Sequence, residues 1–286
     1  MKPAPFEYVR PASVVEAIAA LTEGGFGAKP LAGGQSLIPA MNFRLAQPAL
    51  LVDLGSLDEL RGIRVQEDGA LLIGAMTSHR DVERSDLVAR HSPLLAEVMP
   101  WIAHPQIRNR GTLGGSLAHA DPAAELPSVM QALGAVLHVR GPDGERTIPV
   151  DDFYYGLFTT ALEPDELLVA VEISALPSGS RSAFEEISRR HGDFALAGVA
   201  VVVEPDENDA VKCARISLLS VGDGPVLAER AMASLAGRSL TPDAIREAAR
   251  VTAEDLDPPG DIHASSEFRR HLAGVLTARA LERIRM

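Results

Sequence analysis

The chain of 286 residues has a single cysteine, Cys213. One cysteine forms no disulfide within the chain, and it supplies too few thiolates for an iron–sulfur cluster or a cysteine-rich zinc site. The eight histidines are scattered, without the His-x-Glu-x-x-His spacing that indicates a catalytic metal. We therefore expect no metal site in this chain, and any iron–sulfur chemistry must come from a partner.

Basic residues, aromatic residues and long apolar runs are also scarce. Lys and Arg number 27 against 39 Asp and Glu, for a formal net charge of −12, and aromatic residues make up 4%. Nucleic-acid surfaces need clustered positive charge and stacking aromatics, so no nucleic-acid partner is expected. No apolar run approaches the ~20 residues that span a bilayer, and the N-terminus lacks an apolar signal region. The sequence therefore predicts a cytoplasmic protein without a transmembrane segment.

Three familiar signatures are absent as well: the G-x-G-x-x-G of dinucleotide-binding Rossmann folds, the G-x-x-x-x-G-K-S/T of P-loops and the G-x-S-x-G of serine hydrolases. Two other glycine pairs are present, in Gly33-Gly34-Gln35-Ser36 and Gly114-Gly115-Ser116. Glycine lets a backbone approach a ligand closely, main-chain N–H groups can surround an anion, and hydroxyls add donors. We call residues 32–37 the first cradle and residues 112–116 the second cradle. Together they suggest one pyrophosphate held from two sides.

The stretch around the second cradle, residues 104–127, carries further polar groups. Arg108 and Arg110 are suited to charge-assisted hydrogen bonds with a phosphate. Asp121-Pro122 is typical of a helix start. Taken alone, the same stretch is equally consistent with a glycine turn between two helices and with solvated arginines.

Local patterns predict three lobes, at residues 1–57, 58–176 and 177–286. The last boundary falls at a Pro-Ser-Gly-Ser stretch, which is typical of a linker. In the third lobe we expect strands at 184–188, 197–203 and 211–221, and helices that begin after Thr241 and after Ser265 or Ser266. This lobe is therefore expected to be a sheet covered by helices.

In the first lobe, Ser13 and Glu16 have the spacing of a capping box and predict a helix start. Short apolar runs at 29–31 and 49–54 predict strands on either side of the first cradle. Ser36 is expected to cap the helix that follows the cradle. The first cradle is thus placed at the carboxyl end of a strand.

In the second lobe, Asp68-Gly69 joins two apolar runs and favours a hairpin of 63–67 with 70–74. Helices are expected after Thr77 or Ser78, over 93–103, and from Asp121 as N-cap through Ala132. Further strands are expected at 135–139, 147–150 and 167–173.

The combined motifs resemble the FAD-binding medium subunit of molybdenum hydroxylases of the carbon monoxide dehydrogenase type, and the related flavin domain of xanthine dehydrogenase. The resemblance covers nearly the whole chain, and it rests on residues 5–8, 32–36, 53–54, 107–115 with 121–122, and 189–195. It implies an α+β fold: a two-lobed FAD-binding domain of the vanillyl-alcohol-oxidase/PCMH type, followed by a smaller α+β C-terminal domain with an antiparallel sheet and helices.

The resemblance also implies which residues bind FAD: Ala32, Gly33, Gly34, Gln35, Ser36, Leu37, Thr112, Gly114, Gly115, Ser116, Ala118, Glu125 and Phe194. Glu125 would lie near the sugar and phosphate end of the cofactor, or else be a solvated residue favoured by the helix dipole. Phe194 would be an aromatic lid, or else part of a charged hairpin turn. Position 35 is often His in this family. An amide cannot attach to the flavin methyl carbon, so Gln35 predicts non-covalent FAD.

In flavoproteins the cofactor carries the electron chemistry, so no catalytic side chain is expected here. The family implies an FAD electron-transfer subunit that accepts electrons from 2Fe–2S clusters in a small partner subunit. A large partner with molybdenum-pterin cofactor would oxidise the substrate, within a dimer of heterotrimers. Two alternatives stay open: a stand-alone FAD oxidase or dehydrogenase, which would need an acid–base side chain at the flavin, and a scaffold that binds no flavin. The sequence indicates neither the substrate nor the external electron acceptor.

Overall fold

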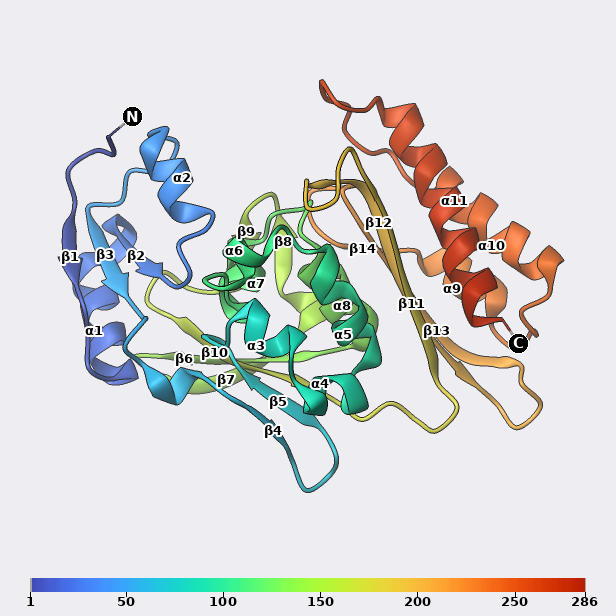
Figure 1. Ribbon diagram of the computed structural model, residues 1–286, viewed down its shortest axis with the longest axis horizontal. Coiled ribbons are helices and arrows are strands. Elements are labelled where there is room, and N and C mark those ends of the chain that lie inside the picture. The colour runs from blue at the N-terminus through green and yellow to red at the C-terminus, as the bar shows by residue number, and fades with distance from the viewer. Residues whose placement is uncertain (1, 286) are drawn as a thin grey trace.

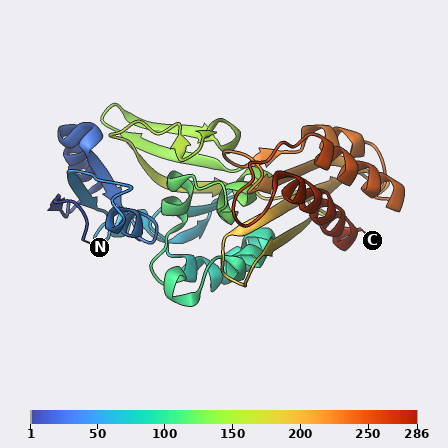
Figure 2. The same cartoon turned by 90° about the horizontal axis from the view of Figure 1, so that it is seen from above.

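Three larger β-sheets follow one another along the long axis of the molecule, in the order in which the chain forms them (Figure 1). The computed structural model describes residues 2–285. In both views the two ends of the chain lie at opposite ends of the long axis (Figure 2). Within residues 2–285, no helix combines the length and the apolar character that crossing a bilayer requires.

The first sheet is parallel, in the order β1–β3–β2, and consists of β1 (Glu7–Val9), β2 (Ala28–Leu31) and β3 (Leu50–Asp53). Helix α1 (Val14–Gly24) covers it, because its apolar residues recur at helical spacing and form one buried face. The predicted start of α1 is confirmed: the Ser13 hydroxyl accepts the N–H of Glu16 at 3.2 Å. The short elements of this region are η1 (Gly25–Gly27), α2 (Leu37–Asn42) and η2 (Asp58–Leu60).

The second sheet is antiparallel, in the order β4–β5–β10–β6–β7: β4 (Ile63–Val65), β5 (Leu71–Gly74), β6 (Val136–Gly141), β7 (Gly144–Pro149) and β10 (Leu167–Ile173). The predicted hairpin is confirmed as β4–β5. Between β5 and β6 the chain forms α3 (His79–Glu83), α4 (Asp86–His91), α5 (Pro93–Val98), η3 (Met99–Trp101), α6 (Pro105–Arg108), α7 (Leu113–His119) and α8 (Glu125–Leu133). After β7 follow η4 (Val150–Asp152) and a small hairpin of β8 (Tyr154–Gly156) and β9 (Thr159–Thr160).

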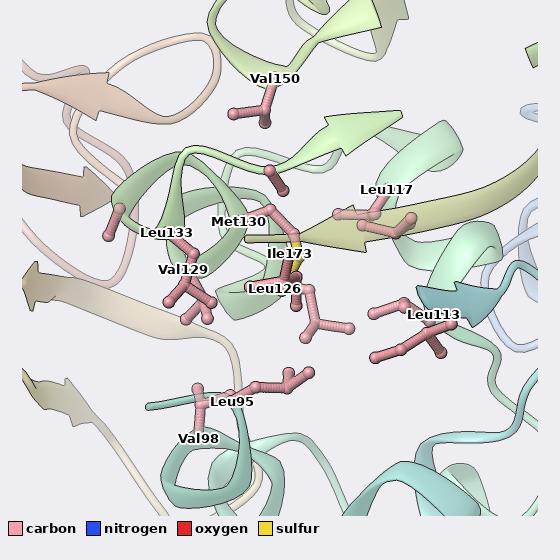
Figure 3. Close-up of a cluster of buried hydrophobic side chains, with 14 of the residues drawn as sticks. Leu95, Val98, Leu113, Leu117, Leu126, Val129, Met130, Leu133, Val150 and Ile173 are labelled. Carbon is pink, nitrogen blue, oxygen red and sulfur yellow. The ribbon is translucent and has the colours of Figure 1, made fainter. Parts of the chain in front are cut away.

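Apolar side chains of α5, α7 and α8 meet above the second sheet (Figure 3). Leu113 and Leu117 of α7 are fully buried there, together with Leu126 and Val129 of α8. Burying a side chain of this size stabilises the fold by roughly 1.5–3 kcal/mol. This core fixes the position of α7, whose first turn is the second cradle.

The third sheet is antiparallel, in the order β11–β12–β13–β14: β11 (Arg181–Ser188), β12 (Ala195–Pro205), β13 (Val211–Leu219) and β14 (Val226–Leu227). Its central strand β12 is buried on both faces. Ala200 and Val202 pack into the core of the second sheet, whereas Val199, Val201 and Val203 face α9 (Glu229–Leu235), α10 (Pro242–Glu254) and α11 (Ser266–Ile284). The third sheet therefore separates the helices of the second lobe from those of the third, and packs against both.

Three local predictions are wrong in detail, for physical reasons. The helix expected from Asp121 begins at Glu125, because the Asp121 carboxylate accepts the N–H of Ala123 at 2.9 Å and forms a turn first. The helix expected over 93–103 breaks after Val98, since Pro100 lacks the N–H that a continuing helix needs. Ser36 precedes α2 without a side-chain cap.

The predicted caps of the last two helices are confirmed. The hydroxyl of Thr241 accepts the N–H of Ala244 at the start of α10, and the hydroxyl of Ser265 accepts that of Phe268 at the start of α11. Each cap satisfies a backbone donor that a helix N-terminus otherwise leaves free, and such a cap stabilises a helix by about 1 kcal/mol.

Candidate functional site

The first cradle leaves the carboxyl end of β2, beside the end of β3. Gly34 has a positive φ of 71°, a conformation that favours glycine. The Gln35 amide donates to the carbonyl of Gly33 at 3.0 Å, so this side chain folds back onto its own loop. Within residues 2–285, the main-chain N–H groups of residues 33–36 have no hydrogen-bond acceptor. Four unsatisfied donors on one turn are a suitable binding site for an anion.

The second cradle uses its donors differently. The N–H of Leu113 donates to the Thr77 carbonyl at 3.0 Å and that of Gly114 to the Ala75 carbonyl at 2.8 Å. The N–H of Gly115 donates to the Thr112 hydroxyl at 3.1 Å, which caps α7. The expectation that main-chain N–H groups of both cradles surround an anion is therefore wrong for the second one. Its remaining polar groups include the Ser116 side chain and the main-chain N–H of Thr112, which has no acceptor within residues 2–285.

The two cradles lie against each other. A Cβ atom added at Gly33 would lie 2.8 Å from the Arg110 carbonyl carbon and 2.8 Å from Gly111 Cα. A Cβ added at Gly115 would lie 3.2 Å from the Ala32 Cβ atom. The structure thus brings together two loops that are separated by about 80 residues in the sequence.

The two arginines next to the second cradle have different environments. Arg108 is buried, where its guanidinium donates to both carboxylate oxygens of Glu83, at 2.9 and 3.1 Å, and to the Ile102 carbonyl at 2.8 Å. The expectation that Arg108 binds a phosphate is therefore wrong, because its donors are already used. Arg110 is exposed and has no ion pair within the described part of the chain.

The open side of α7 continues the second cradle. Ser116 and His119 are half-buried, and Ala118 is exposed. The His119 ring lies 5.1 Å, centroid to centroid, from Phe158 at the tip of the β8–β9 hairpin. Burial lowers the pKa of His119. This face is accessible at Ala118, and the imidazole of His119 lies at its end against Phe158.

Glu125, the first residue of α8, is only 7% exposed. The alternative that Glu125 is a solvated residue is therefore wrong. Burial raises its pKa to about 7, and Glu186 of β11, which is 6% exposed, has its pKa raised to about 8 by burial and by the Glu125 charge. Sequence reasoning missed Glu186. The available signal was strand alternation, which puts it on the same face as the apolar Phe184.

Phe194 is 68% exposed, at the end of the turn between β11 and β12. The turn is held from below: Gly192 has a φ of 85°, and a Cβ there would lie 2.7 Å from the His104 Nδ1 atom. The rings of Trp101 and His191 meet edge-on at 6.1 Å. The turn therefore rests on the segment that leads into the second cradle, and it presents Phe194 to solvent.

The raised pKa values of the buried carboxyls Glu125 and Glu186 predict how the free energy of unfolding changes with pH. The folded-state pKa of Glu186 lies above the ordinary value of 4.5, so stability is lost as the pH rises from about 4.5 to about 8. A shift of this size corresponds to up to about 5 kcal/mol. Glu186→Gln should raise the melting temperature by about 5–10 °C at pH 8.5 and change it little at pH 5.

Glu185→Gln is the matched control. Glu185 lies next in the chain, faces α11 and pairs with Arg283 at 2.8 Å, so its removal should give no gain at pH 8.5. An equal rise for Glu186→Gln at both pH values would contradict the ionisation argument.

The chain matches known families over nearly its whole length. Residues 4–176 match the family described as the FAD binding domain in molybdopterin dehydrogenase, and residues 182–284 match the CO dehydrogenase flavoprotein C-terminal domain. It is 43% identical over 281 residues to the 6-hydroxypseudooxynicotine dehydrogenase complex subunit alpha of Paenarthrobacter nicotinovorans, with 98% of this chain and 95% of that protein covered. It is 42% identical over 283 residues to the carbon monoxide dehydrogenase medium chain of Afipia carboxidovorans, with 99% and 98% covered.

The fold agrees with these matches. It superposes on a carbon monoxide dehydrogenase structure from Hydrogenophaga pseudoflava with a TM-score of 0.96 at 41% identity, covering 99% of this chain and 98% of that one. The predicted α+β class, an FAD-binding domain followed by a C-terminal domain, is confirmed, and so is FAD as the cofactor. The chain belongs to the family of FAD-binding medium subunits of molybdenum hydroxylases, which includes the carbon monoxide dehydrogenase medium chain, and is an oxidoreductase subunit.

Proposed function

We propose that this chain is the FAD electron-transfer subunit of a heterotrimeric molybdenum hydroxylase. It accepts electrons from 2Fe–2S clusters in a small subunit and passes them to an external acceptor, while a large subunit with molybdenum-pterin cofactor oxidises the substrate. The assembly is a dimer of heterotrimers in the cytoplasm. The single cysteine, Cys213, is exposed and alone, which supports placing the clusters in a partner.

One observation carries the assignment of the FAD site. The first cradle offers four main-chain N–H groups without acceptors within residues 2–285, in a loop whose Gly33 has no room for a side chain. These donors fit the pyrophosphate of a dinucleotide, since main-chain dipoles favour negative charge without needing a basic side chain.

The remaining residues of the site take the roles that the geometry allows. Ala32–Leu37 bind the pyrophosphate, and Ser116 supplies a hydroxyl from the open face of α7, beside Ala118. Thr112, Gly114 and Gly115 shape the second cradle through their own hydrogen bonds. We expect Glu125 near the sugar and phosphate end of FAD, and Phe194 as an aromatic lid over the flavin. When bound, FAD supplies the electron chemistry, and Gln35 leaves its attachment non-covalent.

A stand-alone FAD oxidase or dehydrogenase is the second candidate, and Glu125 favours it. Such an enzyme needs an acid–base side chain at the flavin. A buried carboxyl whose pKa is raised to about 7 has the right range for proton exchange near neutral pH. This candidate does not require partner chains. The subunit composition of the purified protein and the rate of flavin reduction by substrate therefore distinguish it from the electron-transfer subunit.

The composition of the native complex tests the proposal. Purification through an affinity tag on this chain should recover two further chains, with iron and molybdenum in fixed ratio to them. Acid precipitation should release about one FAD per copy of this chain into the supernatant, because no covalent bond holds it. Recovery of this chain alone with full FAD would contradict the proposed partner subunits. Flavin that stays with the precipitate would contradict non-covalent binding.

A further inference from the structure

Helix α3 lies directly against residues 108–112, the segment that leads into the second cradle. Its residues contact that segment at successive positions through main-chain and side-chain hydrogen bonds. The donors and acceptors are His79 N–H to the Gly111 carbonyl (2.8 Å), His79 Nε2 to the Thr112 carbonyl (2.9 Å), Arg80 to the Asn109 side-chain oxygen (2.6 Å) and Arg108 Nε to the Glu83 carboxylate (2.9 Å). An isolated antiparallel bridge between Ser78 and Thr112 adds to these contacts. The segment is therefore held in place by α3 as well as by its own short helix α6.

His79 is the part of this contact that reaches the cradle itself. His79 as a whole is 6% exposed. The Thr112 carbonyl can only accept, so Nε2 must carry the proton, and the ring is the neutral Nε2–H form. Nδ1 has no partner within residues 2–285. Burial lowers the pKa of His79 to about 4, the Thr112 carbonyl opposes this shift, and the Arg108 charge adds to it.

The main-chain N–H of His79 holds Gly111, which meets the first cradle beside the Arg110 carbonyl, and its ring holds Thr112, which is linked to the first cradle through Gly115. Gly111 Cα lies 2.8 Å from the Cβ position of Gly33, and the Thr112 hydroxyl caps α7 through Gly115, whose Cβ position is 3.2 Å from Ala32. A shift of the Gly111–Thr112 backbone by a few tenths of an ångström would therefore change how the second cradle packs against the first.

We propose that His79 is a positioning residue for FAD: by holding the carbonyls of Gly111 and Thr112, it fixes the second cradle against the first and so sets the affinity for the dinucleotide. This inference rests on the proposed FAD site. The ring itself does not contact the cofactor, because it is buried beneath the segment that it holds.

Three substitutions of His79 separate positioning from general stability. In His79→Gln the amide nitrogen takes nearly the place of Nε2 and can donate to the Thr112 carbonyl. In His79→Asn the amide nitrogen takes the place of Nδ1 and falls short of that carbonyl. His79→Leu fills the space without any donor. The Thr112 carbonyl keeps the N–H of Ser116 at 3.1 Å, so the variants without the donor lose one buried hydrogen bond, which corresponds to about a tenfold change in affinity.

The measurement is the FAD dissociation constant of the full-length chain after removal of its flavin, by titration with FAD, alongside the melting temperature without FAD. We expect His79→Leu and His79→Asn to raise the dissociation constant about tenfold or more, and His79→Gln to stay within about threefold of the wild type. His138→Leu is the matched control. It removes a half-buried histidine that bonds Glu172 at 3.0 Å on the second sheet, outside both cradles, so FAD binding should be unchanged.

A lower melting temperature with an unchanged dissociation constant in His79→Leu and His79→Asn would overturn the inference and leave His79 a structural residue. If His79→Leu does not fold, the FAD dissociation constants of His79→Asn and His79→Gln decide, since both side chains are amides and only that of Gln reaches the Thr112 carbonyl. A wild-type chain that does not bind FAD would overturn the proposed site itself, and the inference with it.

Discussion

Gly33→Ala should abolish FAD retention. The added Cβ would collide with the Arg110 carbonyl group and would lie 2.8 Å from Gly111 Cα. Both obstacles are backbone, so no rotamer change relieves them, and the two cradles must separate. Overpacking of this kind costs 1–3 kcal/mol or more, and we expect the FAD dissociation constant to rise at least about 100-fold.

The measurement is the flavin absorbance per purified chain, followed by titration of the flavin-free chain with FAD. Gly27→Ala is the matched control in the same lobe, because a Cβ there would lie 3.4 Å from Ala49 Cβ, which is ordinary contact. It should retain FAD. Circular dichroism establishes that both variants are folded. A folded Gly33→Ala chain with wild-type affinity would show that the contact between the cradles does not shape the site.

Gly114 shows why the sequence alone gives an incomplete account of such glycines. From its motif it is expected to let the backbone approach a pyrophosphate. In the structure a Cβ at Gly114 would lie 2.8 Å from the Ala75 carbonyl oxygen, which accepts the Gly114 N–H. Gly114 therefore brings α7 close to the strand region after β5, and its substitution would disturb the fold before it disturbed the ligand. Only the tertiary pairing distinguishes this role from that of Gly33.

Features that depend on near neighbours in the chain were predictable. The caps at Ser13, Thr241 and Ser265 follow from one residue type and its spacing, and the Asp68-Gly69 turn fixes the β4–β5 hairpin. The juxtaposition of the two cradles was also predictable, since both resemble parts of one known site. In each case the deciding interaction is local or belongs to a motif.

Features that depend on partners distant in the chain were not predictable from the sequence. Arg108 resembles a phosphate ligand until Glu83, 25 residues away, is found beside it. Strand alternation places Glu186 on the same face as Phe184, but only the packing of β11 against the second lobe shows that this face is buried. His79 carries no signal in its own sequence context, since its partners are carbonyl groups.

The isolated chain with FAD bound should not be reduced by the substrate of the complex, whereas the assembled complex should be. The physical reason is the lack of a redox route: the single cysteine, Cys213, is exposed and cannot hold a cluster. We expect flavin reduction on substrate addition to be at least about 1,000-fold slower in the isolated chain, which corresponds to about 4 kcal/mol in the barrier. Stopped-flow absorbance of the flavin, with and without the two partner chains, measures this.

Dithionite is the control, because it should bleach the flavin of the isolated chain and so demonstrate that the cofactor is present and reducible. Rapid reduction of the isolated chain by the substrate would favour the stand-alone flavoenzyme instead. In that case Glu125→Gln should remove the reaction, since an amide cannot exchange the proton that a carboxyl with a pKa of about 7 can. If reduction instead requires the partners, Glu125→Gln in the assembled complex should leave the rate of substrate oxidation unchanged, because that step belongs to another chain.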